Sequence, residues 1–192
     1  MDIELGIVAC RQSRDLNDET LTQLLTASED CTLGVDVALL SSDGVTHGAH
    51  SKNLELYSEG FPPASLAAAV HKLPGDLEIV QVTETSNVIA LLLQYVHNQP
   101  QPDSTAFSFE TLAGLAEAAE KYLVYPAIEV CKIRMEASIP GHPLEVFAYA
   151  TRHGYPKLRD AAAPLTIGCP LAAVVTVLGD RPDVFVAWVR CQ

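Results

Sequence analysis

The sequence predicts a mixed α and β fold in which a β-hairpin precedes a long run of helices. Apolar residues alternate with other residues from Val35 to Leu40, which is the two-residue period of a half-buried strand. The dipeptide Asp43–Gly44 follows and is typical of a hairpin turn, because glycine adopts the positive φ that tight turns need. Farther along, the apolar spacing changes to the period of amphipathic helices. These three observations define the predicted class.

The residues after this turn predict a short second strand and then a helix over Ser51–Tyr57. Leu54 and Tyr57 lie on one face of that helix. The helix is expected to end near Gly60, because the two prolines after Phe61 disfavour helical backbone in the residue before them.

One further strand and three longer helices follow in the sequence. Leu77–Val82 has the pattern of a strand. Ser86 is expected to cap a helix over Asn87–His97, whose apolar residues cover most of its circumference and therefore predict burial. Separate apolar stripes predict the helices Glu110–Val124 and Tyr125–Ile139.

The last third of the chain predicts a series of short helices. Proline at a helix start, and glycine or proline at its end, mark their bounds. The predicted helices are Pro143–His153, Pro156–Ala163, Leu171–Leu178 and Pro182–Cys191. Segment 64–73 fits either a helix or a loop.

Composition restricts the kind of protein. The chain has 192 residues, of which 48% are hydrophobic, but no apolar run approaches the roughly 20 residues that span a bilayer. The N-terminus has acidic residues where a signal peptide has basic ones. We therefore expect an intracellular protein, cytoplasmic or nuclear, without a membrane partner. The net charge of −12 repels phosphate backbones, so direct nucleic-acid binding is not expected.

The residues that carry chemistry form no recognisable catalytic constellation. The five cysteines are odd in number, and none forms a C-x-x-C pair, which favours free thiols in a reducing compartment. No phosphate-binding glycine motif and no G-x-S-x-G is present. We expect no enzyme, metal or cofactor, and we interpret His50 as a structural histidine bound to backbone or to Asp36. The alternative is a small hydrolase that uses His50 or Cys131.

Three stretches resemble the BTB/POZ domain family, and they occur in the family's order. Val35–Phe61 is similar to D-V-x-L…A-H-x-x-x-L-x-x-x-S-x-x-F, Glu78–Val96 to the next strand and helix, and Leu112–Cys131 to L-L-x-A-A-D-K-Y-x-V…C. The signature residues of this resemblance are Asp36, Ala49, His50, Leu54, Tyr57, Ser58, Phe61, Tyr122 and Cys131. The amino-acid sequence of the chain is most similar to that of BTB proteins of basidiomycete fungi.

The resemblance implies an α/β (α+β) fold, with a small, mostly antiparallel sheet flanked by a cluster of helices. The BTB/POZ domain would cover residues 31–140, after an N-terminal segment over 1–30 and before a helical extension over 141–192. The family also implies a non-enzymatic protein–protein interaction module, an adaptor or scaffold that frequently forms homodimers. A more specific alternative, taken from some members, is a substrate adaptor of a cullin-3 ubiquitin ligase.

Two positions differ from the family pattern. Transcription-factor members have a basic residue directly after Ala-His, which pairs with the strand Asp, whereas this chain has Ser51. Many members also have a further strand after the helix that here covers 87–97. In this chain Pro100 and Pro102 follow that helix, and proline removes a donor that a strand needs, so we expect that strand to be lost or shortened.

Two apolar groups are candidate interfaces with a protein partner. They are Leu21, Leu24 and Leu25 in the N-terminal segment, and Phe185 and Trp188 near the C-terminal end. The leucines have the spacing of a helix face, with Asn17 or Asp18 as a cap. That helix either packs on its own domain or forms a dimer interface, as it does in family members that exchange it across a two-fold axis.

Overall fold

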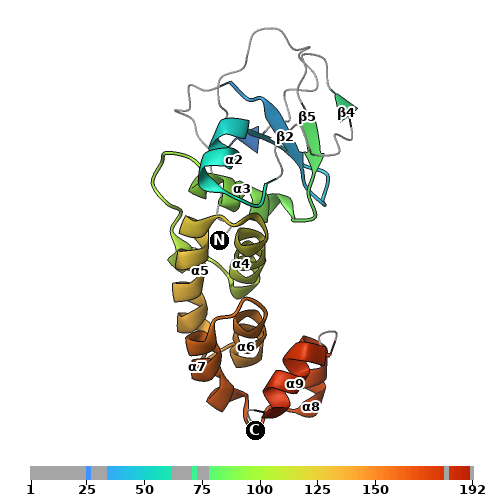
Figure 1. The fold of residues 1–192 in the computed structure, drawn as a ribbon, viewed down its shortest axis with the longest axis vertical. Coiled ribbons are helices and arrows are strands. Elements are labelled where there is room, and N and C mark those ends of the chain that lie inside the picture. The colour runs from blue at the N-terminus through green and yellow to red at the C-terminus, as the bar shows by residue number, and fades with distance from the viewer. Residues whose placement is uncertain (1–24, 27–33, 62–70, 73–77, 180–181, 191–192) are drawn as a thin grey trace. The chain divides into compact units, whose positions relative to one another are not determined.

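The computed structural model describes residues 25–26, 34–61, 71–72, 78–179 and 182–190 (Figure 1). The chain divides into two compact units. The first unit comprises the chain up to Asp103 together with Gly114–Ile128, and the second comprises Ser104–Ala113 together with Glu129 to the end. The predicted α+β class is confirmed, whereas the predicted domain boundaries stay a prediction.

The first unit contains the sheet, in which the described residues form five short strands in the order β1-β3-β2-β5-β4. Their bounds are Leu25–Thr26 for β1, Val37–Leu40 for β2, Thr46–Ala49 for β3, His71–Lys72 for β4 and Glu78–Gln81 for β5. β2 pairs with β3 and β4 with β5 in antiparallel fashion, while β1–β3 and β2–β5 are parallel. The sheet is therefore mixed, and the expectation of a mostly antiparallel sheet was wrong.

The hairpin between β2 and β3 forms as predicted. Gly44 has a φ of +82°, and its N–H donates to the carbonyl of Ser41 at 3.1 Å. Val37 is opposite Ala49 in the resulting register. Val37, Ala38 and Leu39 are all buried, so both faces of β2 are covered, whereas its alternation predicted one buried face.

Two helices, α2 and α3, follow the hairpin in sequence, and the start of α3 is capped by a residue of the hairpin turn. α2 covers Ser51–Tyr57, as predicted, and α3 covers Ser86–Tyr95. Ser86 was expected to cap α3, but Thr85 holds the cap position and makes no side-chain cap bond. The carboxylate of Asp43 in the hairpin turn instead accepts the Ser86 N–H at 2.8 Å, where an anion is favoured by the exposed N–H groups of a helix start.

Two longer helices, α4 (Phe109–Tyr122) and α5 (Tyr125–Ser138), contribute residues to both units. Their predicted apolar stripes are buried. The buried members are Leu112, Leu115, Ala116, Ala119 and Tyr122 in α4, and Ile128, Cys131 and Met135 in α5, with Ile139 just after it. Between α3 and α4 the described residues 98–108 form no strand, and Ser104–Ala106 forms a 3-10 turn, η1.

The second unit continues with four helices: α6 (Pro143–Arg152), α7 (Pro156–Thr166), α8 (Leu171–Leu178) and α9 (Pro182–Arg190). α7 was expected to end before Pro164, but it continues through this proline to Thr166. Leu158, Ala162 and Thr166 recur every four residues and are all buried. Their packing holds the last turn helical although Pro164 lacks the N–H that would bond to the preceding turn.

The helix predicted for the N-terminal segment can be compared with the structure at Leu25. Leu25 lies in β1, which pairs parallel with β3, so the helix expected there is wrong at this position. The edge of β3 offers backbone hydrogen bonds to an extended segment, and a helix face offers none. Leu21 and Leu24 lie outside the described residues. No helix within the described ranges is long and apolar enough to cross a membrane.

Candidate functional site

A small apolar surface on the first unit is the candidate site. It consists of Leu56 and Tyr57 on α2 and Tyr125 at the start of α5, and we call it the α2 surface. The exposed fractions of these residues are 67%, 42% and 51%, respectively. α2 buries only Leu54. Leu56 lies about 200° around the helix axis from Leu54 and therefore points away from the buried side. Tyr57 lies closer to the Leu54 face but is the last residue of the helix, and it is exposed as well.

The α2 surface contains a shallow hollow with an acidic rim. The hollow has a volume of about 170 Å³ and is bordered by residues 55–59, Tyr125 and Pro126. Glu55 and Glu59 supply the acidic groups. Partial loss of solvent and then the Glu59 carboxylate raise the pKa of Tyr125 above its ordinary value. The surface is thus apolar at its centre and negatively charged at its edge.

The signature residues of the sequence resemblance are structural in most cases. Ala49, Leu54, Ser58 and Cys131 are buried, whereas Tyr57 is exposed on the α2 surface. Asp36 was expected to be a buried carboxylate, but it is exposed. Its two oxygens accept the N–H of Ser51 at 2.7 Å and the hydroxyl of Ser51 at 2.6 Å. Ser51, which stands where some family members have a basic residue, thus occupies both oxygens of this carboxylate.

His50 is buried. Of the two hydrogen-bond partners expected for its ring, backbone or Asp36, the structure shows a backbone carbonyl. Its Nδ1 donates to the carbonyl of Gly34 at 2.9 Å. His47 lies three residues earlier, but the described residues contain no group of three or more His, Cys, Asp or Glu side chains placed to hold a metal ion. Cys131 is buried and Cys169 is partly exposed, and both are free thiols. The other three cysteines lie outside the described residues.

A second cluster ties the start of α3 to the end of α4. Glu84 accepts from Lys121 Nζ at 2.8 Å and from the Tyr122 hydroxyl at 2.7 Å. The Tyr122 ring stacks on Phe61, with ring centroids 4.0 Å apart. Burial alone would raise the pKa of Glu84, but hydrogen bonds from Lys121 and Tyr122 outweigh it and hold the pKa below its usual value. Burial of the Tyr122 hydroxyl, and then its hydrogen bond to the Glu84 carboxylate and the charge of that group, raise the pKa of Tyr122.

Glu84→Gln is expected to lower the free energy of unfolding by about 1–3 kcal/mol, because hydrogen bonds to a partly buried charge are lost. Since folding lowers the pKa of Glu84, its contribution is present above the unfolded pKa of about 4.3 and disappears as pH falls below it. Urea unfolding at pH 7 and pH 3 measures both effects. Glu129→Gln is the matched control, because its ion pair with Lys132 is exposed and contributes less than about 1 kcal/mol. Equal losses in both variants would contradict the prediction.

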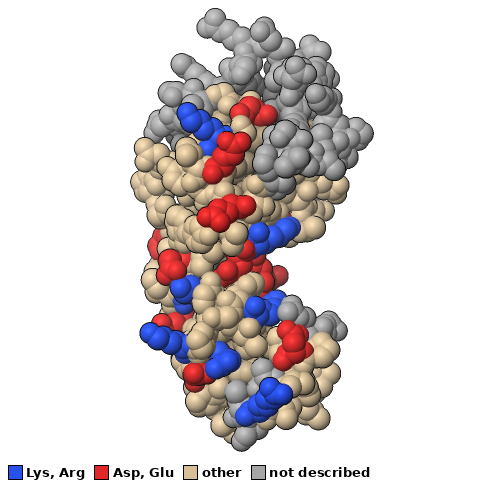
Figure 2. Space-filling model, viewed as in Figure 1, with Lys and Arg blue, Asp and Glu red and all other residues tan. Residues whose placement is uncertain are grey.

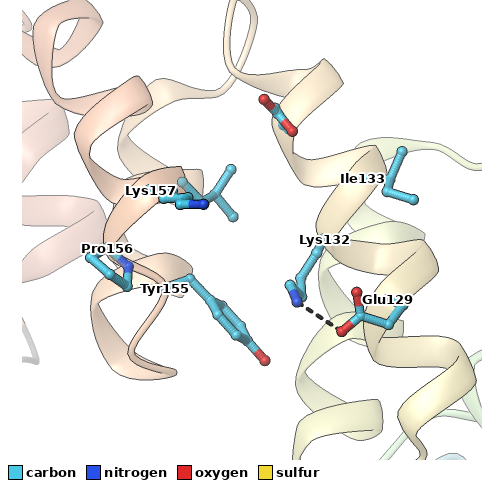
Figure 3. Close-up of a pocket in the computed structure, with 8 residues that line it drawn as sticks. Glu129, Lys132, Ile133, Tyr155, Pro156 and Lys157 are labelled. Carbon is cyan, nitrogen blue, oxygen red and sulfur yellow. Dashed lines mark hydrogen bonds and ion pairs between the residues drawn. The ribbon is translucent and has the colours of Figure 1, made fainter.

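A groove in the second unit lies between α5 and the start of α7 (Figure 3). Its volume is about 460 Å³. In Figure 3, Lys132 points toward Glu129, and its Nζ lies 2.8 Å from that carboxylate and 4.9 Å from the centroid of the Tyr155 ring. Ile133 is exposed in the wall of the groove. Lys132 pairs with Glu129, but exposed Glu136 and Lys157 also line the groove, so its wall is mixed and carries charges of both signs.

The predicted C-terminal surface is partly used within its own unit. Trp188 Nε1 donates to the hydroxyl of Thr166 at 2.9 Å, and its ring contacts that of Phe185 at a centroid distance of 6.0 Å. Both residues are half-buried. A role for Phe185 and Trp188 in an interface stays a prediction.

Charge does not single out any site on the face drawn in Figure 2. There the Lys and Arg side chains of the described residues are interspersed with Asp and Glu, and much of the remaining surface is uncharged. Comparison with known proteins also points to no particular activity: neither a family model nor a curated protein matches this chain. The α2 surface is therefore identified by its exposed apolar side chains alone.

Proposed function

We propose that this chain is a non-enzymatic protein–protein interaction module of the BTB/POZ type, which acts as an adaptor or scaffold inside the cell, in cytoplasm or nucleus. We also propose that its α2 surface binds a second copy of the chain. The observation that carries this proposal is the exposure of Leu56, Tyr57 and Tyr125 side by side. Contiguous apolar surface in water is costly, and its burial recovers about 25 cal/mol per Å².

The order of elements supports the BTB/POZ type. The hairpin β2–β3 is followed by α2, by β5 and then by α3, α4 and α5, with the short β4 before β5. This is the order that the three sequence stretches imply. The two-residue strands at both sheet edges are the part of this arrangement that the stretches did not indicate.

Charge favours a second copy as the partner. A two-fold dimer places the same patch of both chains face to face, so each charge meets the other chain's patch. α2 carries exposed Lys52 at its first turn and exposed Glu55 at its second, and Glu59 follows the helix. An antiparallel pairing of two α2 helices brings Lys52 of each chain to the acidic end of the other. Leu56 and Tyr57 then lie between these charges.

The test is solution mass by light scattering after gel filtration. The wild-type chain is expected near twice its 20.6 kDa. Leu56→Glu adds a third acid to the rim and is expected to weaken dimerisation by at least tenfold, equivalent to about 1.4 kcal/mol. Tyr57→Ala, which removes apolar area without adding charge, is expected to weaken it less.

Ile133→Glu is the matched control. Ile133 is 66% exposed and Leu56 is 67% exposed, so both substitutions place a carboxylate on a helix surface with little change in packing. The control is expected to remain dimeric. A wild-type chain that is monomeric at every concentration, or equal dissociation by both variants, would overturn the proposed self-association.

A further inference from the structure

The groove between α5 and the start of α7 combines buried and exposed apolar side chains (Figure 3). Leu158 in its lining is buried, and Tyr155 is half-buried. Ile133 is 66% exposed. Small-molecule sites enclose most of their ligand, whereas a groove between helices that leaves such a side chain in water suits a segment of another protein.

The α5 wall of the groove is one stripe of that helix. Its members recur at the i, i+3, i+4 and i+7 spacing of a single helix side: Glu129, Lys132, Ile133 and Glu136. Lys132 is neutralised by Glu129 at 2.8 Å, and its Nζ lies over the Tyr155 ring. Glu136 is exposed and has no ion pair with any described residue. Two acids and one base leave this wall net negative.

The α7 wall has the opposite charge. Its one ionised group is Lys157, which is exposed and, like Glu136, has no ion pair with any described residue. Lys157 lies in the first turn of α7, which contains no acidic residue and where the helix dipole also favours an anion. Two unpaired charges of opposite sign therefore border an apolar centre.

We propose that this groove binds an amphipathic helix of a partner protein, whose apolar stripe has a basic residue on one flank and an acidic residue on the other. The basic side chain pairs with Glu136 and the acidic one with Lys157, while the apolar stripe covers Ile133 and Tyr155. A helix packs its side-chain ridge into the groove between two others. A partner helix with like charges on both flanks meets one repulsive wall.

This inference goes beyond the self-association proposed for the α2 surface and does not depend on it. Every residue that borders the α2 surface belongs to the first unit, whereas every residue that lines the groove belongs to the second. A module with both surfaces joins two copies of itself and presents a groove for a partner on each copy.

The probe is a displayed library of helical peptides that are random on one face and on both flanks of that face, selected on the full wild-type chain. The main selected family is expected to have an apolar stripe with one basic and one acidic flank. In fluorescence anisotropy, Ile133→Glu is expected to weaken binding of its tightest member about tenfold, because a carboxylate in the apolar contact loses water. Lys157→Glu is expected to weaken it about threefold, as for an exposed ion pair.

Glu136→Lys tests the charge assignment, because it makes both walls positive. A second selection on this variant is expected to yield peptides with acidic residues on both flanks. Val189→Glu is the matched control, since this α9 residue is 52% exposed and is not part of the groove lining. It is expected to bind the wild-type family unchanged. If Ile133→Glu does not fold, as judged by circular dichroism, the two variants at exposed charged positions decide.

Three results would overturn the proposal. The first is a selection in which no peptide family depends on Ile133 or Lys157. The second is a Glu136→Lys chain that selects the same flanking charges as the wild type. The third is a lower solution mass of Ile133→Glu, which would make a second copy the occupant of the groove. A wild-type chain that is monomeric and still binds the expected peptides would refute the proposed self-association and leave the groove assignment in place.

Discussion

Gly60→Ala is expected to lower the free energy of unfolding by about 3 kcal/mol or more, because the position has no room for a side chain. A Cβ atom at residue 60 would lie 2.5 Å from the Lys121 carbonyl oxygen and 2.5 Å from the Tyr122 Cα. Both are backbone atoms of α4, so no rotamer change relieves the conflict. Gly60 also donates its N–H to the Tyr122 carbonyl at 2.9 Å, and moving the chain away would break this bond.

The measurement is urea unfolding followed by circular dichroism, and Gly141→Ala is the control. At residue 141 the nearest atom to an added Cβ is the Ser138 carbonyl oxygen at 3.9 Å, which is an ordinary contact. The control is expected to change stability by no more than about 0.5 kcal/mol, as most surface substitutions do. If Gly60→Ala behaved like the control, the close approach of residue 60 to α4 would be refuted.

Phe147→Ala is expected to remove about 3–5 kcal/mol from the stability of the second unit. Phe147 lies on α6 and has no exposed surface, and its neighbours Val146 and Tyr149 are also buried. Truncation to alanine removes the transfer energy of the ring and leaves a cavity that rigid helices fill only in part. The expected loss is large because α6 is buried along most of its length.

Hydrogen exchange together with urea unfolding checks this prediction and locates the loss. Protection in α6 and α7 is expected to fall most. Val189→Ala serves as the comparison, because this α9 residue is half exposed and its truncation is expected to cost less than about 1 kcal/mol. A Phe147→Ala chain as stable as the Val189→Ala chain would show that Phe147 is not part of a packed core.

Local signals in the sequence were sufficient for most helices but not for the sheet. α2 and α8 have the predicted bounds, because turn residues and prolines mark their ends within a few positions. Strand direction depends instead on how the chain returns to the sheet: it passes through α2 and β4 before β5 enters parallel to β2. Such crossings leave no periodic pattern.

Two predictions, the Ser86 cap of α3 and the end of α7 before Pro164, were wrong for the same kind of reason. Ser86 has the chemistry of a helix cap, but the carboxylate that serves the α3 terminus comes from Asp43, distant in sequence. Pro164 is a helix breaker by local rules, yet buried contacts of Leu158, Ala162 and Thr166 override it. In both cases a partner that is not adjacent in sequence decides the outcome.

The candidate site was only partly predictable. Tyr57 was singled out, but as a partner of Leu54 on one helix face, and the structure exposes it instead. Leu56 and Tyr125 were not selected, because an apolar residue in a short helix gives no indication of whether a neighbouring element covers it. One feature of the sequence could have indicated the exposure. Leu56 and Tyr57 are adjacent, so they cannot both lie on the buried side of Leu54 in one helix.

The two units alternate along the chain, and this arrangement restricts how recombination can separate them. The first unit needs the chain as far as Ile128, whereas the second already begins at Ser104. No single break in the coding sequence therefore leaves both units complete. Recombination that exchanges one unit for another would need a cut before Ser104 and further cuts within α4 and α5. The two units are therefore expected to be inherited together rather than exchanged separately.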